Sequence, residues 1–412
     1  MNSPPAQTGS NAAGYSVAWI LGLSLAQLVS WGSAVYSFAV FVGPLEAALG
    51  STRGQTSLAF SLALLTEGLA AFAAGRWIDA GHERAVMTGG SLLAGGALIA
   101  HGFVTTLAGL YAVWALLGLG MAGTLYPPVF AVVTRRFPAS FRRAIITLTF
   151  LGGLASTVFI PLTAWLIAQG GWRVASWALG AINLALCVPL HAMLLRHAPR
   201  PAPARQARQV AAAGERAALS AHLRGPVFWR LGAFTVLLMA VSAAVPPHLV
   251  SLLRESGLPA AWAVALPASI GVLQVLGRLA LYAGERRFDV HASNRWAPAL
   301  IPLGLLALLA GSGHVWAALL FALLFGVGNG LLTVVKGTVL AQYVSAAHVG
   351  ALNGALGLPL ALARAAAPLA VGLLWTPAHG YAISLGLLLA LAALGVAMLW
   401  SGQRHAAARV DK

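Results

Sequence analysis

Twelve long apolar stretches, separated by short polar loops, constrain this chain more than any other feature. Of its 412 residues, 59% are hydrophobic and only 8% are charged. A helix needs roughly 20 apolar residues to cross the hydrocarbon core of a bilayer. Windows of this kind predict spans at 16–43, 55–77, 85–106, 108–134, 144–169, 174–195, 227–252, 259–284, 296–312, 314–344, 349–375 and 379–401. We therefore expect an all-α polytopic membrane protein with 12 transmembrane helices and both termini on one side.

The distribution of arginine predicts the orientation of the chain. With a cytoplasmic N-terminus, 19 of the 25 Lys and Arg residues fall in inner loops and tails, and only Arg53, Arg173 and Arg254 fall in outer loops. Such an excess of positive charge on cytoplasmic loops is the positive-inside signal. Contact with anionic lipid headgroups explains the net charge of +16 without a nucleic-acid partner. We predict a monomeric protein of the inner membrane with both termini in the cytoplasm.

Signatures of enzymes, cofactors and metal sites are missing from the sequence. Residues 82–86 begin like a zinc-protease helix but lack the second histidine, and neither a Gly-x-Ser-x-Gly elbow nor a Walker loop occurs. The 11 histidines are scattered along the chain. Cys187 is the single cysteine, which excludes an intramolecular disulfide and a cysteine-built metal site. We expect no enzyme activity, no cofactor and no metal.

A basic stretch near the middle, residues 197–226, divides the chain into two halves. Closely spaced prolines disfavour a helix in the first part of this stretch, whereas about 209–223 suits a short surface helix. Six predicted spans lie on either side, as in membrane proteins built from two parallel repeats. Span four contains Gly118–Gly123, and span ten contains Gly326–Gly330 at the matching place. Small residues at this spacing let membrane helices pack closely, and their repetition favours duplication.

The predicted domain organisation follows from this division. It comprises a disordered N-terminal tail, an N-terminal six-helix bundle, a basic cytoplasmic linker, a C-terminal six-helix bundle and a cytoplasmic tail, at 1–15, 16–196, 197–226, 227–402 and 403–412.

The loop after span two carries a motif. Residues 75–84 read GRWIDAGHER, which resembles the Gly-x-x-x-Asp-Arg-x-Gly-Arg-Arg signature of the major facilitator superfamily. Gly75, Asp79 and Arg84 match, while Ala80 and His82 replace the expected arginine and glycine. The resemblance implies transport by two six-helix bundles that alternate access. It makes the three matching residues a candidate conformational latch, in which the aspartate faces a helix N-terminus or a cytoplasmic arginine.

Within that superfamily, the order of short motifs is similar to the monocarboxylate transporter and oxalate–formate exchanger branch. The motifs are Tyr36–Phe38, Gly43–Leu45, Leu125–Pro127, Arg136–Pro138, Arg142–Ala144, Gly171–Arg173 and Leu223–Trp229. Span five also lacks the Gly-Pro motif of proton-coupled drug antiporters. The resemblance implies an anionic substrate held by a basic residue in span eight and, in the oxalate exchanger, by another in span eleven.

Two arginines inside predicted spans are candidate substrate ligands. Ionisable groups within the bilayer are costly and usually functional, and a guanidinium holds a carboxylate through two parallel hydrogen bonds. Arg278 matches the span-eight position that the resemblance implies, and Arg364 lies about one turn beyond the span-eleven position. The polar residues expected to complete the substrate site are Tyr36, Tyr126, Gln274 and Asn329.

Glu67 is the one acidic residue well inside a predicted span, and two roles stay open for it. A buried carboxyl group is protonated more readily than one in water, so Glu67 is a candidate proton carrier. Alternatively, it forms an ion pair with one of the arginines. The aspartate and the span-one lysine that the family uses for proton symport are absent, and Gln274 stands at the aspartate position. Lys336, near the inner end of span ten, is expected to extend to the headgroups rather than to bind substrate.

These expectations combine into one predicted function. The chain is predicted to be a secondary active transporter of the inner membrane that moves a small organic anion, a mono- or dicarboxylate, by alternating access. Protons or a counter-substrate are the candidate coupling partners. The alternative with the same fold is proton-coupled efflux of drug-like or amphipathic compounds, with Glu67 as the proton site. A transport-inactive sensor is a third hypothesis, but residues 197–226 are too short and too biased in composition for a partner-binding domain.

Overall fold

The computed structural model describes residues 16–137, 140–196, 212–283 and 294–410. The first half forms α1 (Val17–Trp31), a π-helical turn (Gly32–Tyr36), α2 (Phe38–Leu49), α3 (Arg53–Asp79), α4 (Glu83–His101), α5 (Leu107–Thr124), α6 (Tyr126–Arg136), α7 (Phe141–Gly153) and α8 (Ala155–Leu194). The second half forms α9 (Ala212–Arg224), α10 (Pro226–Glu255), α11 (Ala260–Ala283), a 3-10 turn (Ala297–Ala299), α13 (Leu300–Ala310), α14 (Val315–Tyr343), α15 (Val349–Ala355), α16 (Gly357–Leu374) and α17 (Ala382–Val410).

Every predicted span has helical structure at its place in the chain. Within the described residues, nine helical stretches are long and apolar enough to cross a membrane, and a shorter apolar helix covers Asn294–Ala310. Spans five and six share one of the nine stretches, Arg143–Leu194, in which α8 is interrupted at Gly171 with φ 77°. Span three corresponds to α4, which is not among these nine stretches. The surface helix expected in the linker is α9, while residues 197–211 lie outside the described residues.

The start of α3 is fixed by local sequence signals. Gly50 ends α2 with φ 60°, a left-handed conformation that glycine adopts without strain. The Thr52 side chain then accepts from the backbone N–H of Gln55, and the Gln55 side chain accepts from the backbone N–H of Thr52. This reciprocal capping box satisfies two helix-terminal donors. It places Arg53, the first residue of α3, directly beside the loop between α2 and α3.

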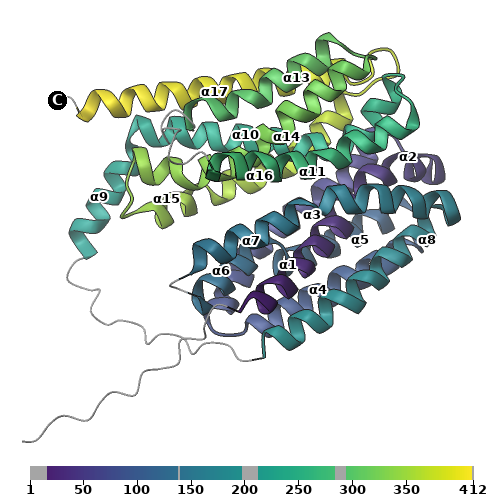
Figure 1. Ribbon diagram of the computed structural model, residues 1–412, viewed down its shortest axis with the longest axis horizontal. Coiled ribbons are helices and arrows are strands. Elements are labelled where there is room, and N and C mark those ends of the chain that lie inside the picture. The colour runs from purple at the N-terminus through teal and green to yellow at the C-terminus, as the bar shows by residue number, and fades with distance from the viewer. Residues whose placement is uncertain (1–15, 138–139, 197–211, 284–293, 411–412) are drawn as a thin grey trace, which may run out of the picture.

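The helices form two groups with separate cores. Figure 1 shows α1–α8 in one group and α10–α17 in the other, stacked along their length. The largest core cluster draws only on residues between Val227 and Leu399. The second draws on residues between Ala26 and Cys187, together with Ala365 from α16. We call these the N-terminal and C-terminal groups.

Glycines allow the closest helix contacts inside each group. A Cβ atom added to Gly118 on α5 would lie 2.1 Å from the Ala63 carbonyl oxygen on α3, and one added to Gly330 on α14 would lie 2.3 Å from the Gln274 carbonyl oxygen on α11. No side chain fits at these distances. The two glycine clusters therefore hold neighbouring backbones together where lipid provides no hydrophobic drive.

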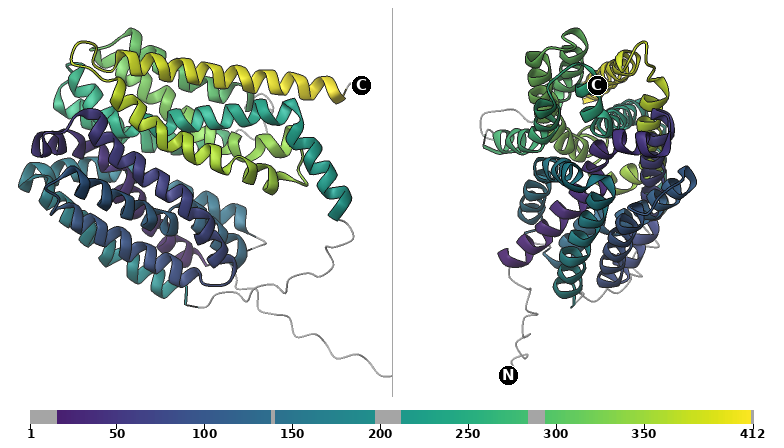
Figure 2. Two further views of the ribbon diagram at one scale, coloured as in Figure 1. Left: turned by 180° about the vertical axis from the view of Figure 1, so that it is seen from behind. Right: turned by 90° about the vertical axis from the view of Figure 1, so that its right-hand side faces the viewer.

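The two groups touch at one end of the molecule and separate at the other. We name these ends by the orientation predicted from arginine: Gly50 and Ser256 lie at the outer end, and α9 and α15 lie at the inner end. Figure 2 shows the groups in contact on the side of α2 and diverging toward α9 and the C-terminus. A cluster of five residues shared by both groups, Ala39, Val40, Ile160, Val250 and Ala268, is buried between them.

Candidate functional site

Helices α3 and α16 form a long seam between the two groups. Near the outer end, a Cβ atom added to Gly372 would lie 2.4 Å from the Ser57 hydroxyl. Further in, the Ser61 hydroxyl accepts from the backbone N–H of Leu369 at 3.1 Å. The innermost close approach brings Gly68 to Ala361, where an added Cβ would lie 2.7 Å from the alanine methyl group. The seam therefore covers the outer and middle parts of both helices.

An ion pair lies at the inner limit of this seam. Glu67 on α3 and Arg364 on α16 approach to 3.3 Å between Oε2 and Nη2. The carboxylate is buried, whereas the arginine side chain is 23% exposed and makes no recorded hydrogen bond within the described residues. Lys336 on α14 is half-buried and lies within electrostatic range of both groups. Two cations beside one anion leave this cluster with a net positive charge.

Beyond the ion pair, α3 and α16 carry exposed side chains. Phe72 is 74% exposed and Leu358 is 60% exposed. No atom lies within 4 Å of a Cβ added to Gly75 on α3 or to Gly357 on α16. The recorded contact between the groups along these helices thus ends beside Glu67 and Arg364, and the ion pair borders the separated inner end.

A second cluster surrounds Arg278 on α11. Its Nη1 donates to the Thr149 carbonyl oxygen on α7 at 2.9 Å, and its Nε donates to the Gly330 carbonyl oxygen on α14 at 3.2 Å. These bonds connect the C-terminal group to the N-terminal group. The Nη2 atom has no recorded hydrogen bond within the described chain, so it retains donors for a ligand.

Aromatic residues from the N-terminal group face Arg278. The Tyr36 hydroxyl lies within interaction range of the Gln274 side chain, and Arg278 lies within electrostatic range of both Tyr36 and Tyr126. The Trp31 ring lies 4.9 Å from the Tyr126 ring and 6.3 Å from the Tyr36 ring, measured between centroids. The structure thus places a guanidinium, an amide and two phenol groups against one aromatic wall.

The two clusters are neighbours along α14. Gly330 belongs to the Arg278 cluster and Lys336 to the Arg364 cluster, and six residues of helix correspond to about 9 Å along the axis. Four of the predicted site residues lie in the first cluster, and Glu67 and Arg364 form the second. Asn329 precedes Gly330, is half-buried, and makes no recorded side-chain hydrogen bond in the described part of the chain.

The residues of the candidate latch are not joined to one another. Asp79 and Arg84 are exposed, and the described residues contain no ion pair for either of them. The buried acid of this loop is Glu83, at 0% exposure. It pairs with Arg136 on α6, with Oε1 2.7 Å from Nε, and with Arg135, with Oε2 3.5 Å from Nη1. The latch stays a prediction, and sequence reasoning missed Glu83 because only its position in the motif, not its burial, is visible there.

At the outer end, Arg53 joins the two groups. It donates to Glu46 on α2, and its Nη2 donates to Glu255 on α10 at 2.8 Å. It also donates to the Tyr381 hydroxyl, and its guanidinium lies 4.7 Å from the centre of the Trp375 ring. The sequence counted Arg53 only among the outer-loop arginines. Its 6% exposure shows that it is a buried contact residue.

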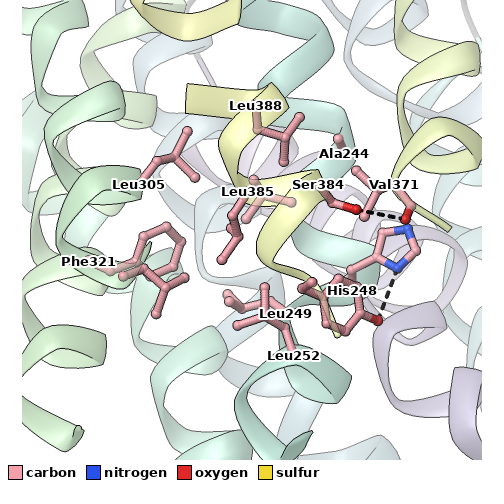
Figure 3. Close-up of a pocket in the computed structure, with 13 residues that line it drawn as sticks. Ala244, His248, Leu249, Leu252, Leu305, Phe321, Val371, Ser384, Leu385 and Leu388 are labelled. Carbon is pink, nitrogen blue, oxygen red and sulfur yellow. Dashed lines mark hydrogen bonds between the residues drawn. The ribbon is translucent and has the colours of Figure 1, made fainter. Parts of the chain in front are cut away.

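A small cavity lies behind this contact. Its volume is about 10 Å³, and Figure 3 shows that its walls are mainly leucines with Phe321, beside His248 and Ser384. An organic anion is far larger than this space, so the cavity is not the substrate site.

The family model described as Major Facilitator Superfamily matches residues 23–290, more than half of the chain. The chain belongs to the Major Facilitator Superfamily. The membership confirms the family prediction and, with the helical model, confirms the all-α polytopic fold and a multi-pass membrane protein.

Relatives within the Major Facilitator Superfamily agree with the predicted branch. The chain is 35% identical over 209 residues to monocarboxylate transporter 13 of Bos taurus and 33% identical over 209 residues to that of Rattus norvegicus. Each match covers 48% of this chain and 45% of the relative, so the chain spans about half the length of the curated relatives it matches. The resemblance to the monocarboxylate transporter branch is therefore confirmed.

Solved structures show the same fold. A bacterial homologue of the human lysosomal transporter Spinster, in an inward-facing and occupied conformation, has a TM-score of 0.74 at 15% identity and covers 96% of this chain and 98% of its own. A nucleoside transporter has a TM-score of 0.69 at 15% identity, covering 94% and 98% of the respective chains. At these identities the likeness concerns the fold alone.

Proposed function

We propose that this protein is a secondary active transporter that moves a small organic anion, a mono- or dicarboxylate, across the inner membrane. The N-terminal and C-terminal groups would alternate access by separating first at one end and then at the other. Superfamily membership and the two monocarboxylate transporter relatives support the transporter class.

The observation that carries the choice of substrate is the state of Arg364. Its guanidinium is partly exposed beside the separated inner end, and it holds Glu67 only by an ion pair without a recorded hydrogen bond within the described residues. A substrate carboxylate can therefore take up two free donors in the bidentate geometry that arginine favours. Lys336 adds a second positive charge in range of the same place.

Arg278 is the second anchor of the proposed site. With its aromatic wall and Gln274, it offers a guanidinium donor and the hydroxyl groups of Tyr36 and Tyr126. Because Arg278 bridges the two groups through backbone carbonyls, substrate binding there would compete with or reinforce contacts between the groups. A ligand shifts a conformational equilibrium only through such differential contacts.

A binding experiment tests the proposal. The purified protein in detergent is heated in the presence of acetate, lactate, oxalate or succinate, with Arg364→Gln as the test variant and Arg404→Gln as the control. Arg404 is exposed on α17, and its replacement removes the same charge. We expect at least one carboxylate to raise the unfolding midpoint of the wild type and of Arg404→Gln but not of Arg364→Gln. Stabilisation by hydrophobic cations alone would instead support the efflux alternative.

A further inference from the structure

His248 on α10 lies directly behind the outer contact made by Arg53. Its Nε2 lies 2.9 Å from the Pro368 carbonyl oxygen, and its Nδ1 lies 3.4 Å from the Tyr381 hydroxyl oxygen. A carbonyl oxygen can only accept, so Nε2 carries the proton in the neutral ring and Nδ1 accepts from Tyr381. The tyrosine oxygen in turn accepts from Arg53. Arg53 therefore donates to the Tyr381 oxygen, and the Tyr381 hydroxyl donates to the unprotonated Nδ1 of His248.

The surroundings of His248 suit only the neutral ring. The residue is 1% exposed, and the adjoining cavity of about 10 Å³ has leucine walls, as Figure 3 shows. Ser384, the hydroxyl beside it, donates to the Val371 carbonyl oxygen at 3.0 Å. Among the described residues, the charged group within electrostatic range of the ring is the Arg53 guanidinium. A protonated His248 would be a cation without hydration, and it would lie near the positive charge of Arg53.

We propose that His248 is a proton-binding site that controls the outer contact: a proton taken from the outer solution onto Nδ1 releases Arg53 and favours separation of the outer ends. With this proton, Nδ1 of His248 changes from a hydrogen-bond acceptor into a donor. Tyr381 can then no longer donate to the ring, and its oxygen lies between an imidazolium and a guanidinium.

Arg53 is the residue that this change displaces. It comes from the N-terminal group, whereas His248, Tyr381, Trp375 and Glu255 all belong to the C-terminal group. Repulsion between the two cations therefore acts across the boundary. When the outer ends separate, water reaches the ring and the repulsion falls, so the separated form binds the proton more tightly. By linkage, lowering the outer pH raises the fraction of that form.

Other titratable groups around the contact are few. Among the described residues, Glu46 from α2 and Glu255 from α10 bind Arg53, and Tyr381 from the segment between α16 and α17 contacts both Arg53 and His248. The same segment carries the exposed His379. The cavity residues from α13, α14 and α17 are Leu305, Leu308, Phe321, Ser384, Leu385 and Leu388. The two carboxylates, both held by Arg53, and the exposed His379 are the described groups whose pH response must be distinguished from that of His248.

The test measures the distance between the outer ends of the two groups and needs no substrate. It rests on the alternating access of the proposed function but not on the anion, so a failed carboxylate assay leaves it intact. Spin labels are placed on Ala48→Cys in α2 and Ala260→Cys in α11, both exposed near the outer end, in a Cys187→Ala background. Distances are measured by pulsed electron resonance in lipid nanodiscs at about pH 7.5 and about pH 5.5, on either side of ordinary histidine titration.

The variants separate histidine from the carboxylates. His248→Gln keeps an amide donor for Pro368 and an oxygen that can accept from Tyr381, but it cannot take up a proton in this range. His314→Gln, exposed on the outer side, is the control. In the wild type and the control, we expect the longer label-to-label distance to become more populated at low pH. The ratio of the separated to the joined form changes by at most about tenfold per pH unit, because one proton is linked to the change.

In His248→Gln we expect the distance distribution to stay the same at both pH values. A wild-type distribution that does not change with pH overturns the proposal, and this measurement needs no variant at position 248. An unchanged pH response in His248→Gln also overturns it and transfers the effect to Glu46, Glu255 or His379. If His248→Gln does not yield a monodisperse protein, His248→Asn takes its place with the same expected result.

Discussion

Glu67 on α3 and Arg364 on α16 form an ion pair across the boundary between the two helix groups, with 3.3 Å between Oε2 and Nη2. Contact between these helices continues outward from the pair, and exposed side chains begin on its inner side. An anion that competes with Glu67 for Arg364 would therefore act on the seam itself. This relationship couples the proposed binding step to the movement of the groups.

Replacing Glu67 with glutamine should strengthen carboxylate binding. The substitution keeps the shape of the side chain but removes the negative charge that competes for Arg364 and Lys336. We expect the dissociation constant to fall about fivefold, which corresponds to about 1 kcal/mol. Titration calorimetry with a carboxylate that stabilises the wild type measures it. Weaker binding in Glu67→Gln would show that this carboxyl group itself takes part in holding the substrate.

Replacing Arg53 with glutamine should open the outer end. The substitution removes the charge-assisted hydrogen bond to Glu255 across the boundary, worth about 1.5–3 kcal/mol, and the bond to the Tyr381 hydroxyl. The balance between the two forms should then shift by about 100-fold. The distance between labels at Ala48→Cys and Ala260→Cys reports the change. Arg254→Gln removes an exposed arginine from the same end and should leave the distance distribution as it is; an equal shift in both variants would count against a specific role of Arg53.

Glu83 should matter more for stability than Asp79. Glu83 is fully buried between Arg135 and Arg136, and removing its charge breaks its ion pairs with two partly buried guanidinium groups. We expect Glu83→Gln to destabilise the protein by about 3 kcal/mol. Asp79→Asn, at an exposed position, should change stability by about 0.5 kcal/mol or less. Thermal unfolding in detergent compares the two, and the reverse order would show that Asp79 rather than Glu83 is the structural acid of this loop.

Two glycines on α14 offer a matched test of helix packing. A methyl group on Gly330 would lie 2.3 Å from the backbone oxygen of Gln274, while one on Gly337 has no atom within 4 Å. Gly330→Ala should therefore cost about 3 kcal/mol and disturb the carbonyl that Arg278 contacts. Gly337→Ala should stabilise the helix by up to about 1 kcal/mol. Equal unfolding midpoints for the two variants would contradict the close approach of α11 and α14.

Hydropathy, the span-two motif and the order of the branch motifs were sufficient to predict the fold. Each apolar window must become a helix in lipid, because backbone groups there have no other hydrogen-bond partner. The apolar windows do not show where a helix is interrupted inside a span. The π-helical turn at Gly32–Tyr36 and the change from α15 to α16 were therefore not predicted.

The candidate site was predicted only in part. The ionisable residues Glu67, Arg278 and Arg364 stood out because charge is rare within spans, and the structure places the first and third together. Arg53 and His248 were missed for the opposite reason. One lies at a span end among ordinary loop arginines, and the other resembles any buried histidine. Their connection through Tyr381 joins residues more than 130 positions apart, which no sequence pattern shows.

Exchange in proteoliposomes tests the central claim most directly. Vesicles containing the wild type, Arg364→Gln or Arg404→Gln are loaded with an unlabelled carboxylate and diluted into a trace of the same compound carrying a radiolabel. The account predicts transient accumulation of label by the wild type and by Arg404→Gln, with loss of accumulation in Arg364→Gln, because only Arg364 lies between the helix groups beside Glu67. Equal accumulation in all three proteins, or none for any carboxylate with the wild type, would contradict an organic anion carried by this site.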